Sequence, residues 1–163
     1  MRNWSAVALV LALAAPAFAD ATADARAHDE AFSKACSAGD VKAVLALYAD
    51  DAVVVWPTAG EEAKGKAAIE KLIPGLCDAK SNTKAVIKSL EAMPLGDSHI
   101  AIIGHWEVTQ TGPDGKTTTS QVRATEVIAK TGSGWRYVLD HASIGLPPPE
   151  AAKKHEPKAE HKK

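Results

Sequence analysis

Apolar side chains recur every three or four residues in the first part of the chain, which is the spacing of one face of a helix. The pattern predicts helices over 22–38 and 41–49, and Asp40 between them is a favoured helix N-cap. A third helix is predicted to start near Lys66, because four apolar residues then share one side: Ile69, Leu72, Ile73 and Leu76. Helices therefore dominate the first half of the chain.

Strand patterns begin with the short apolar run AVVVWP at 52–57 and dominate the second half. Four longer runs, rich in β-branched residues, follow the third helix at 83–93, 98–110, 116–130 and 134–144. The sequences GPDG and TGSG separate the last three runs, and such turns are typical of β-hairpins. We therefore expect these three strands to form an antiparallel meander within a single α+β domain.

The first 19 residues have the pattern of a secretory signal peptide. A basic start is followed by an apolar run, and the sequence AFA at 17–19 fits the small-residue cleavage rule. The apolar run is shorter than a membrane span requires. We expect cleavage after Ala19 and a periplasmic or secreted protein.

The last residues, 147–163, are rich in proline, lysine and glutamate and have no large apolar side chain. Such a segment cannot bury a core, so a disordered tail is predicted. The folded domain is then expected over 20–146. The formal net charge of the whole chain is −1, which argues against nucleic acid as a main partner.

The two cysteines, Cys36 and Cys77, each lie on the apolar side of a predicted helix. Export would place them in an oxidising compartment, where disulfides persist. Because two helices packed on one sheet can bring them together, we expect a disulfide between them; the alternative is two buried free thiols that pack as small apolar groups. No histidine stands at ligand spacing to either cysteine, so no metal site is expected.

Two titratable residues, Asp140 and His141, stand side by side in the closing strand GWRYVLDHASIG. Adjacent residues of a strand point to opposite faces of the sheet. The two side chains therefore cannot approach one substrate as a simple catalytic pair. Each has to be interpreted with the neighbours on its own face.

The lengths of the two hairpin loops decide which residues share the face of Asp140. If GPDG and TGSG are both four-residue loops, Arg123 lies diagonal to Asp140 on one face, near Trp106. Glu126 then shares the opposite face with His141, and a slip of one residue would reverse such assignments. We expect Arg123 either to neutralise Asp140 or to receive an anionic or polar group of a ligand.

Several short stretches resemble one superfamily, the SnoaL-like or ketosteroid isomerase-like proteins, which are also called nuclear transport factor 2-like. The run SAGDVKAVLALYADDAVVVWP resembles the opening of that fold, and GKAAIEKLI resembles the start of its third helix. RATEV and WRYVLDHAS resemble the closing strands. The likeness covers about residues 27–146 and is closest to a branch described as a domain of unknown function.

The resemblance implies a cone-shaped α+β fold, in which three N-terminal helices pack against a strongly curved antiparallel sheet. It also implies a pocket between the sheet and the helices, and a homodimer formed through the other face of the sheet. The pocket positions that it implies in this sequence are Tyr48, Trp56, Trp106, Arg123 and Asp140.

Three hypotheses about function follow. The first is an exported pocket domain that binds a small, partly apolar molecule, without a cofactor and without catalysis. The second is a general acid–base enzyme, an isomerase or dehydratase, with Asp140 as the base and Tyr48 or His141 assisting it. The third is a dimeric assembly module. If Arg123 paired with Asp140, it would lower the pKa of Asp140 and weaken the second hypothesis.

Overall fold

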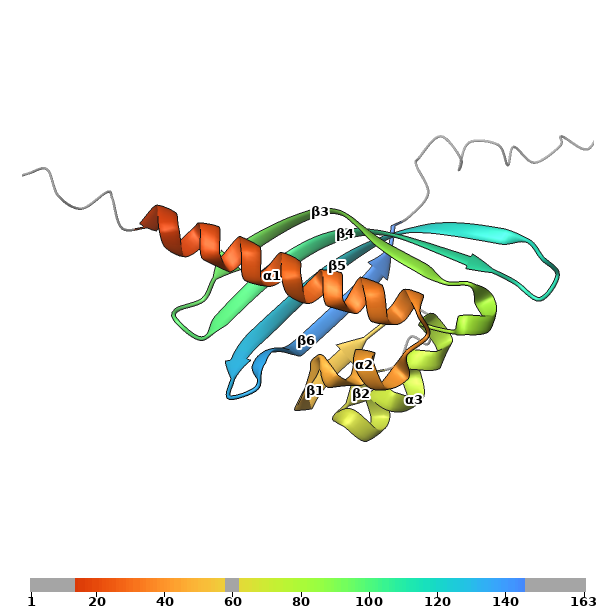
Figure 1. Cartoon of the computed structure of the whole chain (residues 1–163), viewed down its shortest axis with the longest axis horizontal. Coiled ribbons are helices and arrows are strands. Elements are labelled where there is room, and N and C mark those ends of the chain that lie inside the picture. Colours follow the sequence, from red (N-terminus) through yellow and green to blue (C-terminus); the bar gives the residue numbers. More distant parts are fainter. Residues whose placement is uncertain (1–13, 58–61, 146–163) are drawn as a thin grey trace, which may run out of the picture.

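The computed structural model describes residues 14–57 and 62–145 (Figure 1). Most of the predicted signal peptide and the whole predicted tail at 147–163 lie outside these residues. The described residues form the following elements in chain order: α1 Ala14–Ser37, α2 Val41–Ala46, β1 Tyr48–Val55, β2 Glu62–Lys64, α3 Lys66–Leu76, the 3₁₀ helix η1 Ala79–Ser81, β3 Lys84–Pro94, β4 His99–Thr111, β5 Thr117–Thr131 and β6 Gly134–Ile144.

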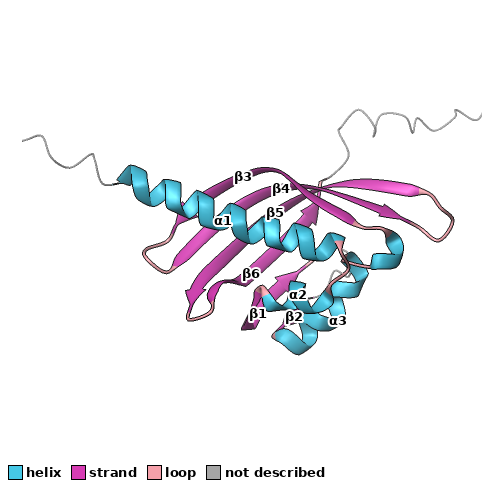
Figure 2. Cartoon of the chain, viewed as in Figure 1, coloured by secondary structure: helices cyan, strands magenta, loops and turns pink. Residues whose placement is uncertain are grey.

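The six strands form one curved sheet in the order β2-β1-β6-β5-β4-β3. Neighbouring strands are antiparallel except β1 and β6, which are parallel, so the sheet is mixed and not wholly antiparallel as predicted. The long helix α1 lies across one face, and α2 and α3 gather at the end where β1 and β2 lie (Figure 2). None of the helices in the described ranges is long and apolar enough to cross a membrane.

The three predicted helices are present, but the second is shorter than its periodicity indicates. It ends at Ala46, and Tyr48 is the first residue of β1 and not the last turn of a helix. The carbonyl of Leu47 accepts a hydrogen bond from the backbone N–H of Tyr137 at 2.8 Å, and Tyr48 is the strand partner of Tyr137. Pairing with β6 therefore overrides the helical preference of this segment.

The predicted disulfide between Cys36 and Cys77 is present, with both residues almost fully buried. It joins the last turn of α1 to the residue that follows α3. The bridge spans 41 residues of sequence, and closing a loop of that length contributes about 4 kcal/mol in the chain-entropy account. The bridge thus fixes two helices over the same part of the sheet.

The strand register differs from the prediction by one residue in both hairpins. The loop between β4 and β5 has five residues, because Thr111 pairs with Thr117 and not with Lys116. Lys130 pairs with Trp135 as predicted. However, β6 has a bulge between Tyr137, the partner of Ile128, and Leu139, the partner of Val127. Each slip moves β5 by one position relative to its neighbour.

The two slips reverse the faces of β5. Ala124 and Glu126 lie on the buried face, whereas Arg123 and Thr125 are exposed on the outer face. The assignments on β4 and at Asp140 were correct, since Trp106 and Asp140 are both buried.

Candidate functional site

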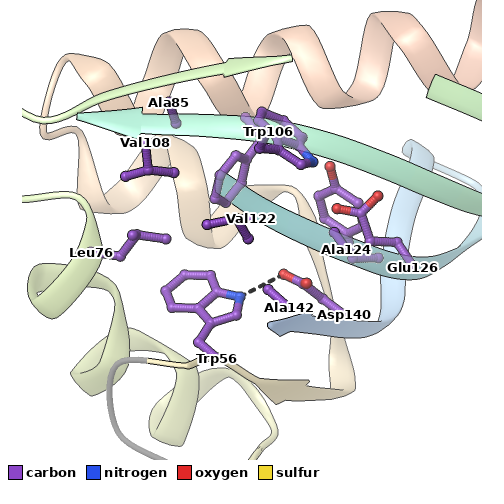
Figure 3. A pocket seen from close by; sticks show the side chains of 12 residues that line it. Trp56, Leu76, Ala85, Trp106, Val108, Val122, Ala124, Glu126, Asp140 and Ala142 are labelled. Carbon is purple, nitrogen blue, oxygen red and sulfur yellow. Dashed lines mark hydrogen bonds between the residues drawn. The ribbon is translucent and has the colours of Figure 1, made fainter. Parts of the chain in front are cut away.

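A cavity lies between the inner face of the sheet and the helices that cover it (Figure 3). The described side chains that line it are mostly apolar or aromatic: Phe32, Trp56, Leu76, Ala85, Trp106, Val108, Val122, Ala124, Glu126, Tyr137, Asp140 and Ala142. Its volume is about 40 Å³. One water molecule needs roughly 10–15 Å³ by this measure, so the cavity has room for a few waters or for a small organic group.

The disulfide-linked helices and the sheet each contribute to the cavity wall. Phe32 comes from α1 one turn before Cys36, and Leu76 is the last residue of α3, directly before Cys77. The ring of Phe32 packs edge-on against the rings of Trp56 and Trp106, with centroids 6.1 and 5.8 Å away. These contacts fix the aromatic wall.

Trp106 occupies the space that Gly104 leaves on the same face of β4. A Cβ atom at Gly104 would lie 2.7 Å from the indole Nε1 of Trp106, which is too close for any side chain. The glycine therefore allows the tryptophan ring to lie flat over the strand. The glycine does not leave an open space in the cavity.

Asp140 stands at one side of the cavity and is held by two hydrogen bonds. Its Oδ2 accepts the hydroxyl of Tyr48 at 2.6 Å and the indole N–H of Trp56 at 2.8 Å. Tyr48 begins β1, and Trp56 directly follows its end. Both donors reach Asp140 because β1 runs parallel to β6, with Val54 as the strand partner of Asp140.

A second carboxyl, Glu126, is the cross-strand partner of Asp140 on β5. Both residues are only 4% exposed. Directly opposed residues on one face of an antiparallel pair have Cβ atoms about 4.5–5.5 Å apart. The cavity thus contains two neighbouring acids, and within its described lining there is no lysine, arginine or histidine.

A third carboxyl, Asp29, reaches the same region from α1. It is fully buried, and its Oδ1 accepts the hydroxyl of Tyr137 at 2.6 Å. The ring of Tyr137 lies 5.0 Å from that of Tyr48, and the ring of His28 lies 4.3 Å from Tyr137. Aromatic rings therefore connect Asp29 to the pair formed by Glu126 and Asp140.

Burial in this cluster disfavours negative charge. It raises the pKa of Glu126 well above its usual value, and the charges of Asp29 and Asp140 act in the same direction. Burial also raises the pKa of Asp140, although the hydrogen bonds from Tyr48 and Trp56 oppose it. The pKa of Asp29 rises to about 7 for the same reason, opposed by its hydrogen bond from Tyr137. At least part of the cluster is therefore protonated near neutral pH.

Two neighbouring residues of α1 give opposite pH dependences of stability. Asp29 binds its proton more tightly in the folded chain, so its contribution is complete below about pH 4 and is lost as the pH rises through about 7. Burial lowers the pKa of His28 from 6.5 to about 4. The contribution of His28 is therefore complete above about pH 6.5 and is lost as the pH falls through about 4.

Two polar atoms in the cavity wall have no hydrogen-bond partner. They are the indole Nε1 of Trp106 and the Oε2 of Glu126, and both residues are at least 95% buried. Figure 3 shows the indole nitrogen pointing to the side of the cavity where Glu126 lies. Buried polar groups are normally satisfied, so these atoms indicate a place for a hydrogen-bonding guest.

The structure brings together four of the five predicted pocket residues. Trp56, Trp106 and Asp140 line the cavity, and Tyr48 lies behind Asp140 as its hydrogen-bond donor. Arg123 is exposed on the outer face, where it is the strand partner of His105 and Ser143. The predicted Arg123–Asp140 pair is therefore wrong, and its reason is the register slip of β5.

His141 is exposed and pairs with Thr125 on the outer face, so the prediction that Asp140 and His141 point to opposite sides is confirmed. His141 therefore lies outside the cavity. The prediction that His141 and Glu126 share one face of the sheet is wrong, since Glu126 faces inward. Glu126 is the site residue that the sequence reasoning missed, although it stands in phase with the apolar residues Ala124 and Ile128.

Solved structures with the same fold include three from different bacteria. One is a nuclear transport factor 2-like protein with a cystatin-like fold from Novosphingobium aromaticivorans, with 18% identity and a TM-score of 0.68, over 85% of this chain and 91% of that chain. Another is a proposed dehydratase of the same family from Streptomyces avermitilis, with 19% identity and a TM-score of 0.67, over 80% and 99%. The third is a ketosteroid isomerase-like protein from Erwinia carotovora, with 23% identity and a TM-score of 0.65, over 80% and 100%.

At these identities the structural likeness is a likeness of fold, namely helices packed on a curled sheet in an α+β cone. No curated protein sequence matches the chain. The sequence profile of the SnoaL-like domain, however, matches residues 26–147, which include the cavity-lining residues and both cysteines. The chain belongs to the SnoaL-like domain family.

Proposed function

We propose that the protein is a binding protein whose interior cavity takes a small, partly apolar molecule. The observation that carries this proposal is the pair of unpartnered polar atoms, on Trp106 and Glu126, in an otherwise largely apolar wall. Ligand sites of proteins commonly combine an apolar lining with a few convergent polar groups. A guest with one polar group would satisfy these atoms while its remainder contacts the aromatic rings.

A substitution that fills the cavity should abolish binding without removing any polar group. Ala142→Leu adds a larger side chain to the cavity wall, whereas Ala101→Leu makes the same change on the outer face as a matched control. We expect ethanol, ethylamine or acetate, which match the cavity volume of about 40 Å³, to bind the unaltered protein in ligand-observed NMR, and Ala142→Leu to weaken that binding at least about tenfold. Overpacking costs about 1–3 kcal/mol, so the fold should persist.

Two results would contradict the binding proposal. One is that none of the three probes binds the unaltered protein at millimolar concentration. The other is that Ala142→Leu and Ala101→Leu leave binding equally unchanged, because the probe would then bind elsewhere on the surface.

A second candidate function is general acid–base catalysis, and the raised pKa values of Asp140 and Glu126 favour it. A catalytic acid or base works best when its pKa lies near the working pH. The predicted charge partner that would have lowered the pKa of Asp140 is absent from its side of the sheet, since Arg123 faces outward. Two relatives in fold are a proposed dehydratase and a ketosteroid isomerase-like protein.

Proton abstraction next to a carbonyl group is the simplest reaction that separates an enzyme from a binding protein. If the second candidate is correct, the protein will accelerate deuterium incorporation into acetone in D₂O, measured by ¹H NMR. Asp140→Asn should then lower that rate at least about a hundredfold, which is the acceleration that a general base usually contributes. A rate equal to that of buffer, or one unchanged in Asp140→Asn, would contradict the catalytic role.

We also propose that the protein is exported and forms a homodimer through the outer face of its sheet. The disulfide is of the kind that persists in oxidising compartments. Ile103 and Leu139 are 45% and 38% exposed on the outer face, and Val127 lies half-buried between them. A second copy would cover these apolar side chains.

Native mass spectrometry of protein recovered from a periplasmic extract checks both parts of this proposal. We expect a chain that starts at Asp20, lacks two hydrogens because of the disulfide, and has twice the monomer mass as the intact species. A chain that retains residues 1–19 would contradict export with cleavage. A monomer at micromolar concentration would contradict the dimer.

A further inference from the structure

The cavity has an unbalanced set of charges. Among its described lining residues, Glu126 and Asp140 are acids and none is basic, and Asp29 adds a third carboxyl behind Tyr137. The positive groups that act on the cluster lie outside the cavity: Arg26 acts on Asp29, Arg136 acts on His28, and His141 acts on Asp140 from the outer face. No charged partner inside the cavity balances the acids.

This arrangement selects among the possible polar groups of a ligand. An anion would meet two carboxyls and no cation, which is unfavourable in a buried site. A neutral group fits only while the acids keep their protons. A cation would lie beside acids that lack a counter-ion, and its hydrogen bonds to them would be charge-assisted.

We infer that the ligand is a small organic amine, whose positively charged nitrogen binds between Glu126 and Asp140. This inference rests on the proposed binding function and specifies the class of ligand. The nitrogen would donate to Oε2 of Glu126, the oxygen that has no partner. It would reach Asp140 from the cavity side, while Tyr48 and Trp56 keep their hydrogen bonds to Oδ2.

The rest of the wall suits such a ligand. Trp56, Trp106 and Phe32 provide aromatic surface for an apolar body and for cation–π contact with the amine. The unpartnered N–H of Trp106 would donate to a hydroxyl or carbonyl oxygen near the amine. Amines that also carry such an oxygen would therefore satisfy every unpartnered atom in the cavity lining.

Binding of a cation has a defined pH dependence. Burial raises the pKa of Asp29, Glu126 and Asp140, and repulsion between carboxylates adds to this for Asp29 and Glu126, so the empty cavity favours their protonated forms. A bound cation favours ionised Glu126 and Asp140, so amine uptake should release protons. Affinity for an amine should therefore rise with pH until the amine itself loses its proton. Affinity for a neutral analogue should stay constant or fall.

Three probes that share a two-carbon body separate the classes of ligand: ethylamine, ethanol and acetate. We expect ligand-observed NMR titration of the unaltered protein at about pH 8.5 to show ethylamine binding at least about tenfold more tightly than ethanol, the factor that corresponds to one pKa unit. The preference should shrink at about pH 6. Acetate should bind more weakly than either probe at both pH values.

A matched pair of variants tests the role of Glu126. Glu126→Gln retains the shape of the side chain and removes its charge, and it should lower ethylamine affinity at least about tenfold more than it lowers ethanol affinity. Glu91→Gln makes the same change on the exposed outer face and should alter neither affinity. The pH comparison on the unaltered protein does not depend on the folding of either variant.

The outcomes distinguish this inference from the binding proposal on which it rests. If ethanol binds as tightly as ethylamine at about pH 8.5, or if Glu126→Gln leaves ethylamine affinity unchanged, the amine inference is overturned and the binding function stands. If ethylamine affinity falls as pH rises from about 6 to about 8.5, the inference is also overturned. If no probe binds, both fail.

Discussion

The structure depends on one buried carboxylate oxygen, Oδ2 of Asp140, and on the two donors that it accepts. A carboxyl at 4% exposure is costly unless it is hydrogen-bonded. Tyr48 and Trp56 supply the two hydrogen bonds from the two ends of β1. Both donors lie at the ends of β1, which pairs in parallel with β6 and places Val54 beside Asp140. This polar interaction thus links the two parallel strands of the mixed sheet.

The same interaction explains the position of the cavity. Trp56 donates a hydrogen bond to Asp140, and the ring of Trp56 packs against Phe32 on α1. The disulfide holds the end of α1 beside the end of α3, so that Phe32 and Leu76 stay over the sheet. The cavity is enclosed by elements that are far apart in sequence. The disulfide and the hydrogen bonds to Asp140 hold these elements together.

The acid cluster connects this architecture to chemistry. Folding places Asp29, Glu126 and Asp140 in one region that contains no internal cation. Burying these acids in their charged forms costs free energy, and this cost raises their pKa values. A protein that only needed stability would be served by apolar residues at these positions. We interpret the cluster as a feature of binding or of proton transfer, and both remain consistent with membership of the SnoaL-like family, whose fold does not by itself specify an activity.

The sequence alone predicted the elements and the fold well. The helical spacing and the turn sequences located the three helices and the four long strands, and the positions of Cys36 and Cys77 on apolar helix faces predicted the disulfide. Tyr48 was placed on a helix because its spacing fits one, and only the long-range pairing with Tyr137 excludes that. Such pairing leaves no local signal in the sequence.

The composition of the site was harder to predict because it depends on register. A five-residue loop in place of four, and one bulge in β6, were sufficient to exchange Arg123 for Glu126 on the inner face of β5. With Arg123 on the inner face, Asp140 would be neutralised; with Glu126 there, Asp140 has a second acid beside it. An error of one residue therefore changed the expected charge of the cavity wall. The alternation of Glu126 with Ala124 and Ile128 was the available signal, and the assumed loop lengths contradicted it.

The most direct test of this account is an NMR pH titration of the side-chain carboxyl carbons in protein labelled with ¹³C at aspartate and glutamate. The account predicts that Glu126 titrates well above the ordinary range of about 4, that Asp140 titrates above it, and that Asp29 titrates near pH 7. Midpoints at or below about 4 for Glu126 and Asp140 would show that the acids are solvated or paired with a cation. That result would contradict the buried, unbalanced cluster on which the proposed site depends.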